Sequence, residues 1–395
     1  MTWTTPAELK DQVERLWERG KILAAAITGD PVFPLNLRLR RPDRKAMADR
    51  FEDVRLWIRQ LEEGARPRQG FGYDIEWTEI EHRQLGRNRV PSAVVVPTRD
   101  DALRLIGKSR AAARAEALTA ATLATFPVLH PWIIKKPLVL LEHANDWDRI
   151  LAVLSWFRRH PRSALYLRQL DIPGVDTKFI EARKSLLAEL LDLTLPPDVI
   201  DATPGRSFEA RYGLRSKPPL VRFRLLDARH RIGGLSDVAT PIAEFDTLAL
   251  GVRRIFITEN EINGLAFPDL PDSAVIFGLG YGIDGLAGIA WLKEKSIHYW
   301  GDIDTHGFAI LDRLRASCPD ARSILMDRDT LLEHRALWVT DTARHPGALT
   351  RLTPEEQDLF EELAADTHGD RVRLEQERLG FGWVERALAG VAQDS

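Results

Sequence analysis

Cysteine is nearly absent from this sequence. Cys318 is the single cysteine among 395 residues. One thiol cannot form an intramolecular disulfide, and a cysteine-rich zinc site is excluded for the same reason. We therefore expect a protein of a reducing compartment and predict a cytoplasmic location.

Long apolar runs are missing as well. Stretches such as residues 137–141 fall far short of the roughly 18 apolar residues that a membrane span needs. The first 12 residues carry Glu8, Lys10 and Asp11 and lack the apolar core and small-residue cleavage site of a secretion signal. We expect a soluble protein without membrane contact. The hydrophobic content of 44% fits a globular chain, and the length favours three domains.

Charge is unevenly distributed along the chain. Residues 1–250 contain 40 Lys and Arg against 33 Asp and Glu, whereas residues 251–395 contain 15 against 25. A basic first part suits phosphate groups, and an acidic second part suits cations. The same drift also arises when two domains simply differ in surface charge, so the motifs must decide between these interpretations.

The N-terminal region combines helical and extended patterns. Apolar residues at three- and four-residue spacings predict helices over residues 6–27, 44–61, 100–126 and 147–159. β-Branched and aromatic residues between glycines and prolines predict strands at 73–77 and 92–96. Since no chemical motif accompanies them, we predict an α+β region over residues 1–155 that contacts partners.

A basic segment follows this region. Its pattern predicts a short strand, a helix over 177–193 and an extended portion at 221–226, an order compatible with a CAP-like winged-helix domain. Eight Lys and Arg face two acidic residues between 206 and 231, and alternation places Arg222 and Arg224 on one strand face. A solvated strand face would show the same alternation. We predict a winged-helix domain over residues 156–240 that contacts DNA through these residues: Lys178, Arg206, Arg211, Arg215, Lys217, Arg222 and Arg224.

The last part of the chain alternates between strands and helices. Strands are predicted at 254–258, 274–278, 297–300 and 323–326, with helices such as 286–293 and 308–316 between them. This order is typical of a parallel sheet covered by helices on both faces. The sequence therefore predicts an α/β domain over residues 241–395, with its reactive groups at the carboxyl edge of the sheet.

Three acidic residues follow two of these strands. Glu259 comes directly after strand 254–258, and Asp302 and Asp304 follow strand 297–300. Carboxylates that meet at one sheet edge repel one another unless a cation neutralises them, and hard oxygen ligands suit Mg²⁺ or Mn²⁺. Such an ion can polarise a phosphate group and activate water. We predict a metal centre formed by these three residues.

Each acidic residue also has a simpler structural explanation. Thr258 and Glu261 fit a capping box, and Asp304 fits the N-cap of a helix that begins near His306. The Asp-x-Asp spacing further suggests a phosphatase of the haloacid dehalogenase type, but His306 stands where that motif has Thr or Val. A Glu at one strand end and an Asp-x-Asp at another together favour the metal centre.

This pairing resembles the Toprim domain of type IIA and type VI topoisomerases, primases and related nucleases. Four strings extend the resemblance: LYLRQLDIPGVDTKFIEARK at 165–184, RYGLRSKPPLVRFRLLD at 211–227, FITENEINGLAFP at 256–268 and YWGDIDTHGFAILDRLR at 299–315. They resemble the JetD family, the nuclease subunits of Wadjet plasmid-defence systems. The resemblance covers most of the chain, and the last two strings are the specific ones.

The resemblance implies an N-terminal arm, a winged-helix domain and a Toprim domain, as in the topoisomerase VI cleavage subunit. It also implies a homodimer that cuts double-stranded plasmid DNA together with an SMC-type ATPase complex. Carried over by position, Glu259 is the acid/base or metal-ligating residue, and Asp302 and Asp304 are the magnesium ligands.

Topoisomerase VI relatives attack DNA with a tyrosine of the winged-helix domain. Here Tyr166 lies in an apolar run typical of a core, and Tyr212, beside Arg211, is suited either to stacking on DNA or to packing. Since neither has further supporting signals, we expect hydrolysis by metal-activated water. Covalent tyrosine cleavage and a non-catalytic DNA-binding adaptor are the alternatives.

Overall fold

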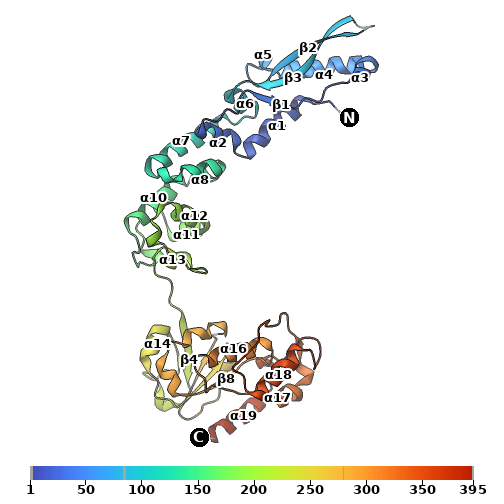
Figure 1. The fold of residues 1–395 in the computed structure, drawn as a ribbon. Helices are drawn as coiled ribbons and strands as arrows, with labels where there is room; N and C mark the ends of the chain where they lie inside the picture. The colour runs from blue at the N-terminus through green and yellow to red at the C-terminus, as the bar shows by residue number, and fades with distance from the viewer. Residues whose placement is uncertain (1–2, 83–85, 279, 394–395) are drawn as a thin grey trace. The chain divides into compact units, whose positions relative to one another are not determined.

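The computed structural model describes residues 3–82, 86–278 and 280–393 (Figure 1). The chain forms two compact units, Met1–Ser216 and Lys217–Ser395. Within the described ranges, buried apolar residues form two cores in the first unit and one in the second. No helix in these ranges is both long enough and apolar enough to cross a membrane.

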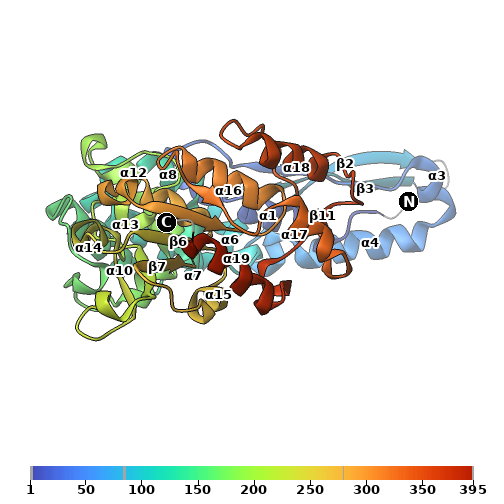
Figure 2. The same cartoon turned by 90° about the horizontal axis from the view of Figure 1, so that it is seen from below.

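The first half of the N-terminal unit packs helices against a three-stranded antiparallel sheet of order β1-β3-β2. Strands β2 and β3 run beside α4 (Figures 1 and 2), and Val54 and Ile58 of α4 line a groove with Ile80 and Val90 of the strands. The elements are α1 (Pro6–Glu18), α2 (Lys21–Thr28), β1 (Leu35–Leu37), α3 (Arg44–Asp49), α4 (Phe51–Gly64), α5 (Arg66–Gln69), β2 (Asp74–His82), β3 (Gly86–Val96), α6 (Arg99–Leu105) and α7 (Ser109–Thr125).

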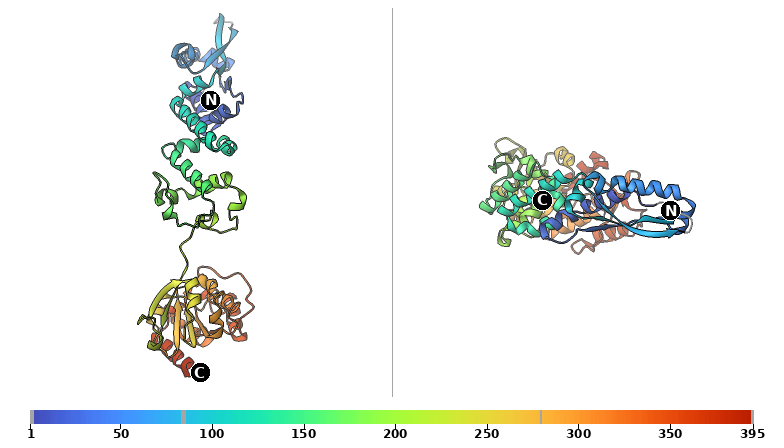
Figure 3. Two further views of the ribbon diagram at one scale, coloured as in Figure 1. Left: turned by 90° about the vertical axis from the view of Figure 1, so that its left-hand side faces the viewer. Right: turned by 90° about the horizontal axis from the view of Figure 1, so that it is seen from above.

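The helices and strands expected in this half are present, but three of the helices are interrupted. The helix expected over residues 6–27 is divided at Gly20, and that over 100–126 is divided at Gly107. Both glycines have a φ near 70°, a conformation that ends a helix and that glycine adopts without steric cost. The helix expected over 44–61 is divided at Arg50. Strands β2 and β3 are longer than expected and stand out as a ribbon in Figure 3.

The second half of this unit is helical. Its core includes the fully buried Trp147, Leu187 and Leu190, which come from two helices. The expected helix 147–159 is confirmed as α10, and the helix expected over 177–193 is divided at residues 182 and 183. The helices are α8 (His130–Lys135), α9 (Pro137–Glu142), α10 (Trp147–Arg159), α11 (Thr177–Glu181), α12 (Lys184–Thr194) and α13 (Phe208–Arg211).

The extended portion that we assigned to the winged-helix domain belongs to the other unit. It forms β4 (Leu220–Leu225), which pairs with β5 (Asp237–Pro241) and with a strand of the C-terminal sheet. Val221, Phe223 and Leu225 are buried in the core of that unit. An alternating pattern predicts a half-buried strand but does not say which sheet the strand joins. The structure divides the chain into compact units between residues 216 and 217, whereas we predicted a boundary at 240, and residues 221–226 lie in the C-terminal sheet.

The C-terminal unit is built on a six-stranded sheet of order β5-β4-β7-β6-β8-β9. Strands β7, β6, β8 and β9 are parallel, and β4 and β5 add an antiparallel edge. The expected parallel sheet is thus the larger part of a mixed one. The remaining elements are α14 (Ile242–Leu248), β6 (Arg254–Thr258), α15 (Glu261–Ala266), β7 (Ser273–Phe277), β8 (Ser296–Trp300), α16 (Thr305–Arg315), β9 (Arg322–Ser323), α17 (Arg328–Glu333), β10 (Val339–Thr340), α18 (Pro354–Ala364), β11 (Val372–Arg373) and α19 (Phe381–Gln393).

Both faces of this sheet are covered. Every residue of β6 and β7 is buried, as parallel strands between two helical layers require. On β4, Phe223 contacts Phe245 of α14, with ring centroids 5.0 Å apart. Arg224, on the opposite face, donates to the carbonyl oxygen of Leu265 in α15. The helix expected over 286–293 is instead two short 3-10 helices, Gly280–Leu286 and Ala290–Glu294.

Candidate metal centre

Two neighbouring parallel strands end at the candidate site. Thr258 of β6 lies opposite Trp300 of β8, so Glu259 and Gly301 leave the sheet side by side. Glu259 therefore lies beside the loop that begins with Gly301 and Asp302. This is the carboxyl edge of the parallel strands, where reactive groups of α/β proteins gather.

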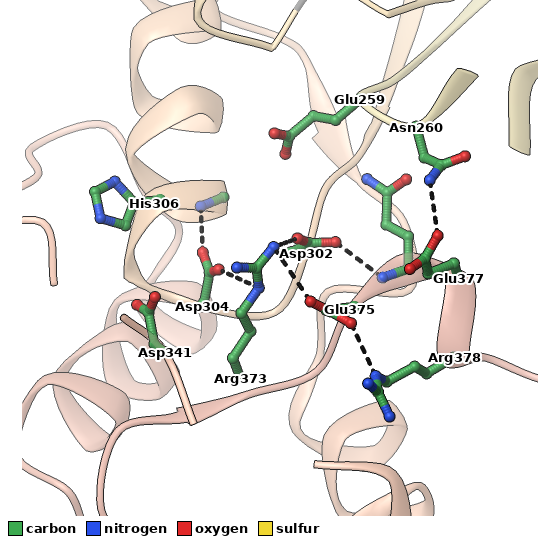
Figure 4. Close-up of polar contacts among 12 residues, drawn as sticks. Glu259, Asn260, Asp302, Asp304, His306, Asp341, Arg373, Glu375, Glu377 and Arg378 are labelled. Carbon is green, nitrogen blue, oxygen red and sulfur yellow. Dashed lines mark hydrogen bonds and ion pairs between the residues drawn. The ribbon is translucent and has the colours of Figure 1, made fainter. Parts of the chain in front are cut away.

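An antiparallel bridge beyond β8 brings a distant segment to this edge. Ile303 and Leu374 exchange two backbone hydrogen bonds of 2.9 and 3.1 Å, and both side chains are buried. In extended segments, alternate side chains point to the same face. The four residues that flank the bridge share the other face and lie together in Figure 4: Asp302, Asp304, Arg373 and Glu375.

The guanidinium group of Arg373 lies between the two aspartates. Its Nη2 donates to Oδ2 of Asp302 at 2.5 Å, and its Nε lies 3.1 Å from Oδ2 of Asp304. Burial opposes the charge, but the hydrogen bond to Asp302 and the nearby carboxylates raise the pKa of Arg373. The site thus contains an internal cation that supplies part of the neutralisation we had assigned to a metal alone.

Asp304 has two roles in this geometry. Its Oδ1 accepts the amide of Gly307 at 2.7 Å and caps α16, so the N-cap interpretation is confirmed. Its Oδ2 faces Arg373. Burial raises the pKa of Asp304, and the charge of Asp302 adds to this effect. Residue 307 must be glycine because a Cβ there would lie 2.1 Å from the carbonyl oxygen of Asp302.

Glu259 is positioned by a buried tyrosine. The hydroxyl of Tyr299 donates to Oε1 of Glu259 at 2.6 Å. Burial raises the pKa of Glu259, and the charges of Asp302 and Asp304 raise it further, while the hydrogen bond from Tyr299 opposes them. Burial and the nearby Glu259 also raise the pKa of Tyr299, so its hydroxyl remains a donor. Gly301 leaves room for that hydroxyl, because a Cβ there would lie 2.5 Å from it.

Gln376 forms hydrogen bonds with Asp302 and with the ends of strands β6 and β8. Its backbone amide donates to Oδ1 of Asp302 at 2.8 Å, and its side-chain amide donates to the carbonyl oxygen of Trp300 at 2.6 Å. Its side-chain oxygen accepts from the hydroxyl of Thr258 at 2.8 Å. The capping box that we considered for Thr258 and Glu261 is therefore wrong. Asn260 caps α15 instead, accepting from the amide of residue 263.

Glu259 and Asp302, but not Asp304, line an open pocket of about 210 Å³. Its lining is Glu259, Asn260, Asp302, Arg373, Glu375, Gln376 and Glu377. Carboxylate oxygens are the ligands that Mg²⁺ and Mn²⁺ prefer, and the guanidinium between Asp302 and Asp304 marks a position that suits positive charge. The donor set therefore fits a hard divalent cation.

A second acidic cluster lies elsewhere in the C-terminal unit. Among the residues that the structure describes, three metal-ligand atoms within 4.8 Å of one another occur only at Asp227, His230 and Asp272. Both oxygens of Asp227 accept backbone amides and the fork of Arg229, at 2.6–3.1 Å. Nε2 of His230 lies 2.8 Å from Asp272. These bonds engage both oxygens of Asp227, Nε2 of His230 and Oδ1 of Asp272, so the cluster is already bonded within the protein.

Four of the seven residues predicted to contact DNA are paired with carboxylates. Arg222 and Arg224 share one face of β4, as predicted, but that face packs against α15 rather than being left open. Arg222 pairs with Asp237 at 2.6 Å and with Glu261. The other pairs are Arg224–Asp269, Arg211–Asp192 and Arg206–Asp201, at 2.8, 2.8 and 3.1 Å.

The other three predicted DNA contacts are exposed. Lys178, Arg215 and Lys217 form no ion pair with any residue in the described ranges. Arg215 lies over the ring of Tyr166, 5.7 Å from its centroid. Of the seven predicted residues, these three are exposed and without an ion pair in the part of the chain that the structure describes.

Of the two tyrosines considered as nucleophiles, one differs from expectation. Tyr166, expected in the core, is 40% exposed. Tyr212 is buried, and its hydroxyl donates to Asp192 at 2.7 Å, while the carbonyl oxygen of Ala188 lies 2.9 Å from the same hydroxyl oxygen. Burial raises the pKa of Tyr212. Packing rather than DNA stacking is therefore the role of Tyr212 in this structure.

Sequence reasoning missed the segment that completes the site. Arg373, Glu375 and Glu377 alternate along a short stretch and line the pocket together. Alternation of charged residues was the available signal, but the segment lies about 70 residues beyond Asp302 and pairs with it through a single bridge. Tyr299 was also missed, because it looks like an ordinary strand residue.

Fold and site together define a two-unit α+β protein whose C-terminal unit carries a carboxylate and arginine centre at the edge of a mixed sheet. Residues 213–388 match the family described as Wadjet protein JetD, C-terminal, and residues 6–192 match an uncharacterized N-terminal family conserved in bacteria. The chain belongs to the JetD family of Wadjet defence systems. No curated protein matches it.

Proposed function

We propose that the chain is a metal-dependent DNA endonuclease subunit and that its C-terminal unit is a Toprim-like catalytic domain. The observation that carries this proposal is that Asp302 and Asp304 hold the cation Arg373 at the carboxyl edge of parallel strands, with Glu259 at the end of the neighbouring strand. Membership of the JetD family supports it, since we infer that the family supplies the nuclease of a plasmid-defence complex.

In this proposal, Asp302 and Asp304 hold Mg²⁺ or Mn²⁺, with Glu259 as a further ligand or acid/base group. When bound, the ion supplies positive charge that polarises the scissile phosphate and lowers the pKa of water. Tyr299 orients the carboxylate of Glu259 through its hydrogen bond, and Gln376 orients that of Asp302. Burial raises the pKa of Glu259, which brings proton exchange by this group closer to neutral pH.

Water is the proposed nucleophile. Tyr212 is buried and already bonded to Asp192, so its oxygen is poorly placed to attack a phosphodiester. Tyr166 is exposed, but the described residues place no general base beside its hydroxyl; its ring contact is with Arg215. Both observations favour hydrolysis over a covalent tyrosine intermediate.

The proposed substrate is double-stranded plasmid DNA. Lys178, Arg215 and Lys217 are the proposed phosphate contacts, since they are exposed and form no ion pair within the described residues. We further propose that residues 156–216 form the remainder of a winged-helix domain, that the protein works as a homodimer, and that an SMC-type ATPase complex activates it. Family membership supports the last two points.

A non-catalytic DNA-binding adaptor is the second candidate. The observation that favours it is Arg373, which already neutralises part of the charge on Asp302 and Asp304. An adaptor needs no exchangeable cation, so its acidic centre would be a structural network like that of Asp227.

Cleavage assays distinguish these functions. The purified chain is incubated with circular plasmid and Mn²⁺, with and without the SMC-type complex and ATP. A nuclease produces linear or nicked DNA only with Mn²⁺, and Asp302→Asn abolishes the product. If the parent and Asp302→Asn bind DNA equally and neither cleaves it in the presence of the SMC-type complex and ATP, the chain is an adaptor.

A further inference from the structure

Arg373 is held asymmetrically in the acidic centre. Nη2 makes a 2.5 Å hydrogen bond to Asp302. Nε lies 3.1 Å from Asp304, close enough for an ion pair, but its N–H direction is not aligned, and no residue in the described ranges accepts a hydrogen bond from it. A buried donor without an aligned acceptor is costly. The guanidinium is therefore well bonded on one side and poorly bonded on the other.

A second carboxylate lies within reach of the same guanidinium. Nη2 of Arg373 is 3.8 Å from Oε1 of Glu375, which follows it by two residues on the same face. Arg378 also pairs with Glu375, at 2.8 Å through the other oxygen, Oε2. One oxygen of Glu375 is thus anchored by Arg378, while the other faces Arg373. A small movement can transfer the guanidinium from Asp302 to Glu375 without leaving its charge unpaired.

We propose that Arg373 is an exchangeable internal cation, which occupies the space between Asp302 and Asp304 and transfers to Glu375 when a divalent ion binds the two aspartates. This inference rests on the proposed function of the centre as a metal site. A divalent ion and a guanidinium on the same two carboxylates would repel each other, so the two cations exclude one another. Arg373 thereby lowers the apparent affinity for the metal.

The exchange also accounts for the open geometry of the centre. Asp227, His230 and Asp272 place their ligand atoms within 4.8 Å of one another, but the described carboxylates around Arg373 do not form such a group. A guanidinium spans more space than a metal ion, whose ligands lie at about 2.0–2.6 Å from it. Release of Arg373 allows Asp302 and Asp304 to close on the smaller ion.

Manganese binding provides the test. Free Mn²⁺ is measured by electron paramagnetic resonance during titration of the full-length protein, the Arg373→Gln variant and the Arg328→Gln variant. Arg328 is the matched control, because it pairs with Glu362 on the same unit and contacts none of the site residues. We expect Arg373→Gln to bind Mn²⁺ about tenfold more tightly, a change of about 1.4 kcal/mol, and Arg328→Gln to match the parent.

A double-mutant cycle separates transfer from direct ligation. If Glu375 acts by receiving Arg373, Glu375→Gln weakens Mn²⁺ binding in the parent and has no effect in the Arg373→Gln background. If Glu375 is itself a metal ligand, its removal weakens binding in both backgrounds, and the proposed transfer is overturned. Arg373→Lys, which keeps the charge but loses the fork, is expected to give an intermediate affinity.

Three results would contradict the inference, and only the third would also contradict the proposed function. If Arg373→Gln still shows a cooperative thermal transition but binds Mn²⁺ no more tightly than the parent, Arg373 has only a structural role. The proposal that the centre binds a metal is then unaffected. If Arg373→Gln shows no such transition and therefore does not fold, Arg373→Lys takes its place. A Mn²⁺ affinity of Arg373→Lys equal to or below that of the parent would overturn the exchange. If neither the parent nor Arg373→Gln binds Mn²⁺, the proposed function fails together with the inference.

Discussion

Two clusters in the C-terminal unit place an arginine between carboxylates, and they differ in how the carboxylates are satisfied. At Asp227, the arginine is two residues away, and backbone amides complete the coordination of both oxygens. At Asp302 and Asp304, the arginine comes from a distant segment, and one of its contacts lacks an aligned hydrogen bond. The number of charges is similar, but the second cluster is incompletely bonded.

The pKa shifts of the two clusters run in opposite directions. The hydrogen bonds from Arg229 and from two backbone amides hold the pKa of Asp227 well below its usual range. Burial and neighbouring carboxylates raise the pKa of Glu259 and of Asp304. A satisfied network stabilises its charges, whereas a centre that must bind a ligand keeps unfavourable charge until the ligand arrives. Proximity of ligand atoms alone selects the cluster at Asp227, whereas the pKa shifts favour the centre that we propose.

The largest expected difference between the clusters is in cleavage. Asp302→Asn should reduce plasmid cleavage by at least about a thousandfold, because it removes a ligand on which the proposed chemistry depends. Asp227→Asn should leave cleavage per folded molecule within about twofold, although it lowers the melting temperature. Cleavage with Mn²⁺ and the SMC-type complex measures both. Equal losses in the two variants would remove the distinction drawn here.

A smaller effect is expected from the tyrosine that orients Glu259. Tyr299→Phe should lower kcat about tenfold, since a buried hydrogen bond to a charged group is lost. That bond opposes the rise in the pKa of Glu259, so the acid limb of the pH–rate profile should also move to higher pH. The matched control is Tyr212→Phe, because the Tyr212 hydroxyl also donates to a carboxylate, that of Asp192.

The variants Tyr212→Phe and Tyr166→Phe test which group is the nucleophile. With water as the attacking group, Tyr212→Phe and Tyr166→Phe keep most activity and leave no protein on the DNA ends. Protein-linked ends that disappear in one of these variants would identify a tyrosine nucleophile instead. An unshifted pH profile in Tyr299→Phe would reduce that residue to a packing role.

The local hydrophobic pattern of the sequence predicted the site residues that directly follow strands. Strands 254–258 and 297–300 were recognised from apolar runs, and their parallel pairing brings Glu259 beside Asp302. Arg373 could not be placed, because it reaches the site through one bridge with a segment about 70 residues away. Such a long-range contact has no periodic signature in the sequence.

The N-terminal unit and β4 show the same limit. Helix existence followed from apolar spacing, and the interruptions followed from backbone conformation at Gly20 and Gly107. Alternation on β4 correctly placed Arg222 and Arg224 on one face. It could not show that this face packs against α15, since a strand of any sheet has the same period.

Salt dependence extends the comparison to the basic residues. Arg215→Ala with Lys217→Ala should reduce the slope of log affinity for DNA against log salt by about 2, because each exposed cation is proposed to release one counterion. Arg222→Ala with Arg224→Ala should change the slope by less than about 0.5, because both guanidinium groups are already paired. Filter binding on one DNA fragment at several salt concentrations measures both slopes. The reverse ranking would mean that DNA displaces the ion pairs on β4.

The smallest expected effect is on stability, and it has opposite signs at the two clusters. Burial raises the pKa of Glu259 above its ordinary value of 4.5, so its contribution to stability is present below that pH and is lost as pH rises through the raised pKa. Without metal, Glu259→Gln should therefore raise the melting temperature at pH 7 by about 2–4 °C, the shift that ~1 kcal/mol gives in a unit of this size. The gain should vanish toward pH 4.

Asp227 provides the opposite case. Its pKa lies below the ordinary value of 3.8, so its contribution to stability is present above that pH and is lost only as pH falls through the depressed pKa. The loss of melting temperature in Asp227→Asn should therefore stay constant between pH 7 and pH 5, while the gain in Glu259→Gln declines. Scanning calorimetry in the presence of a chelator follows both variants across this range. If the changes in melting temperature of the two variants depend on pH in the same way, the carboxylates of the acidic centre are as fully hydrogen-bonded as those at Asp227. The centre would then have no unfavourable charge for a ligand to neutralise.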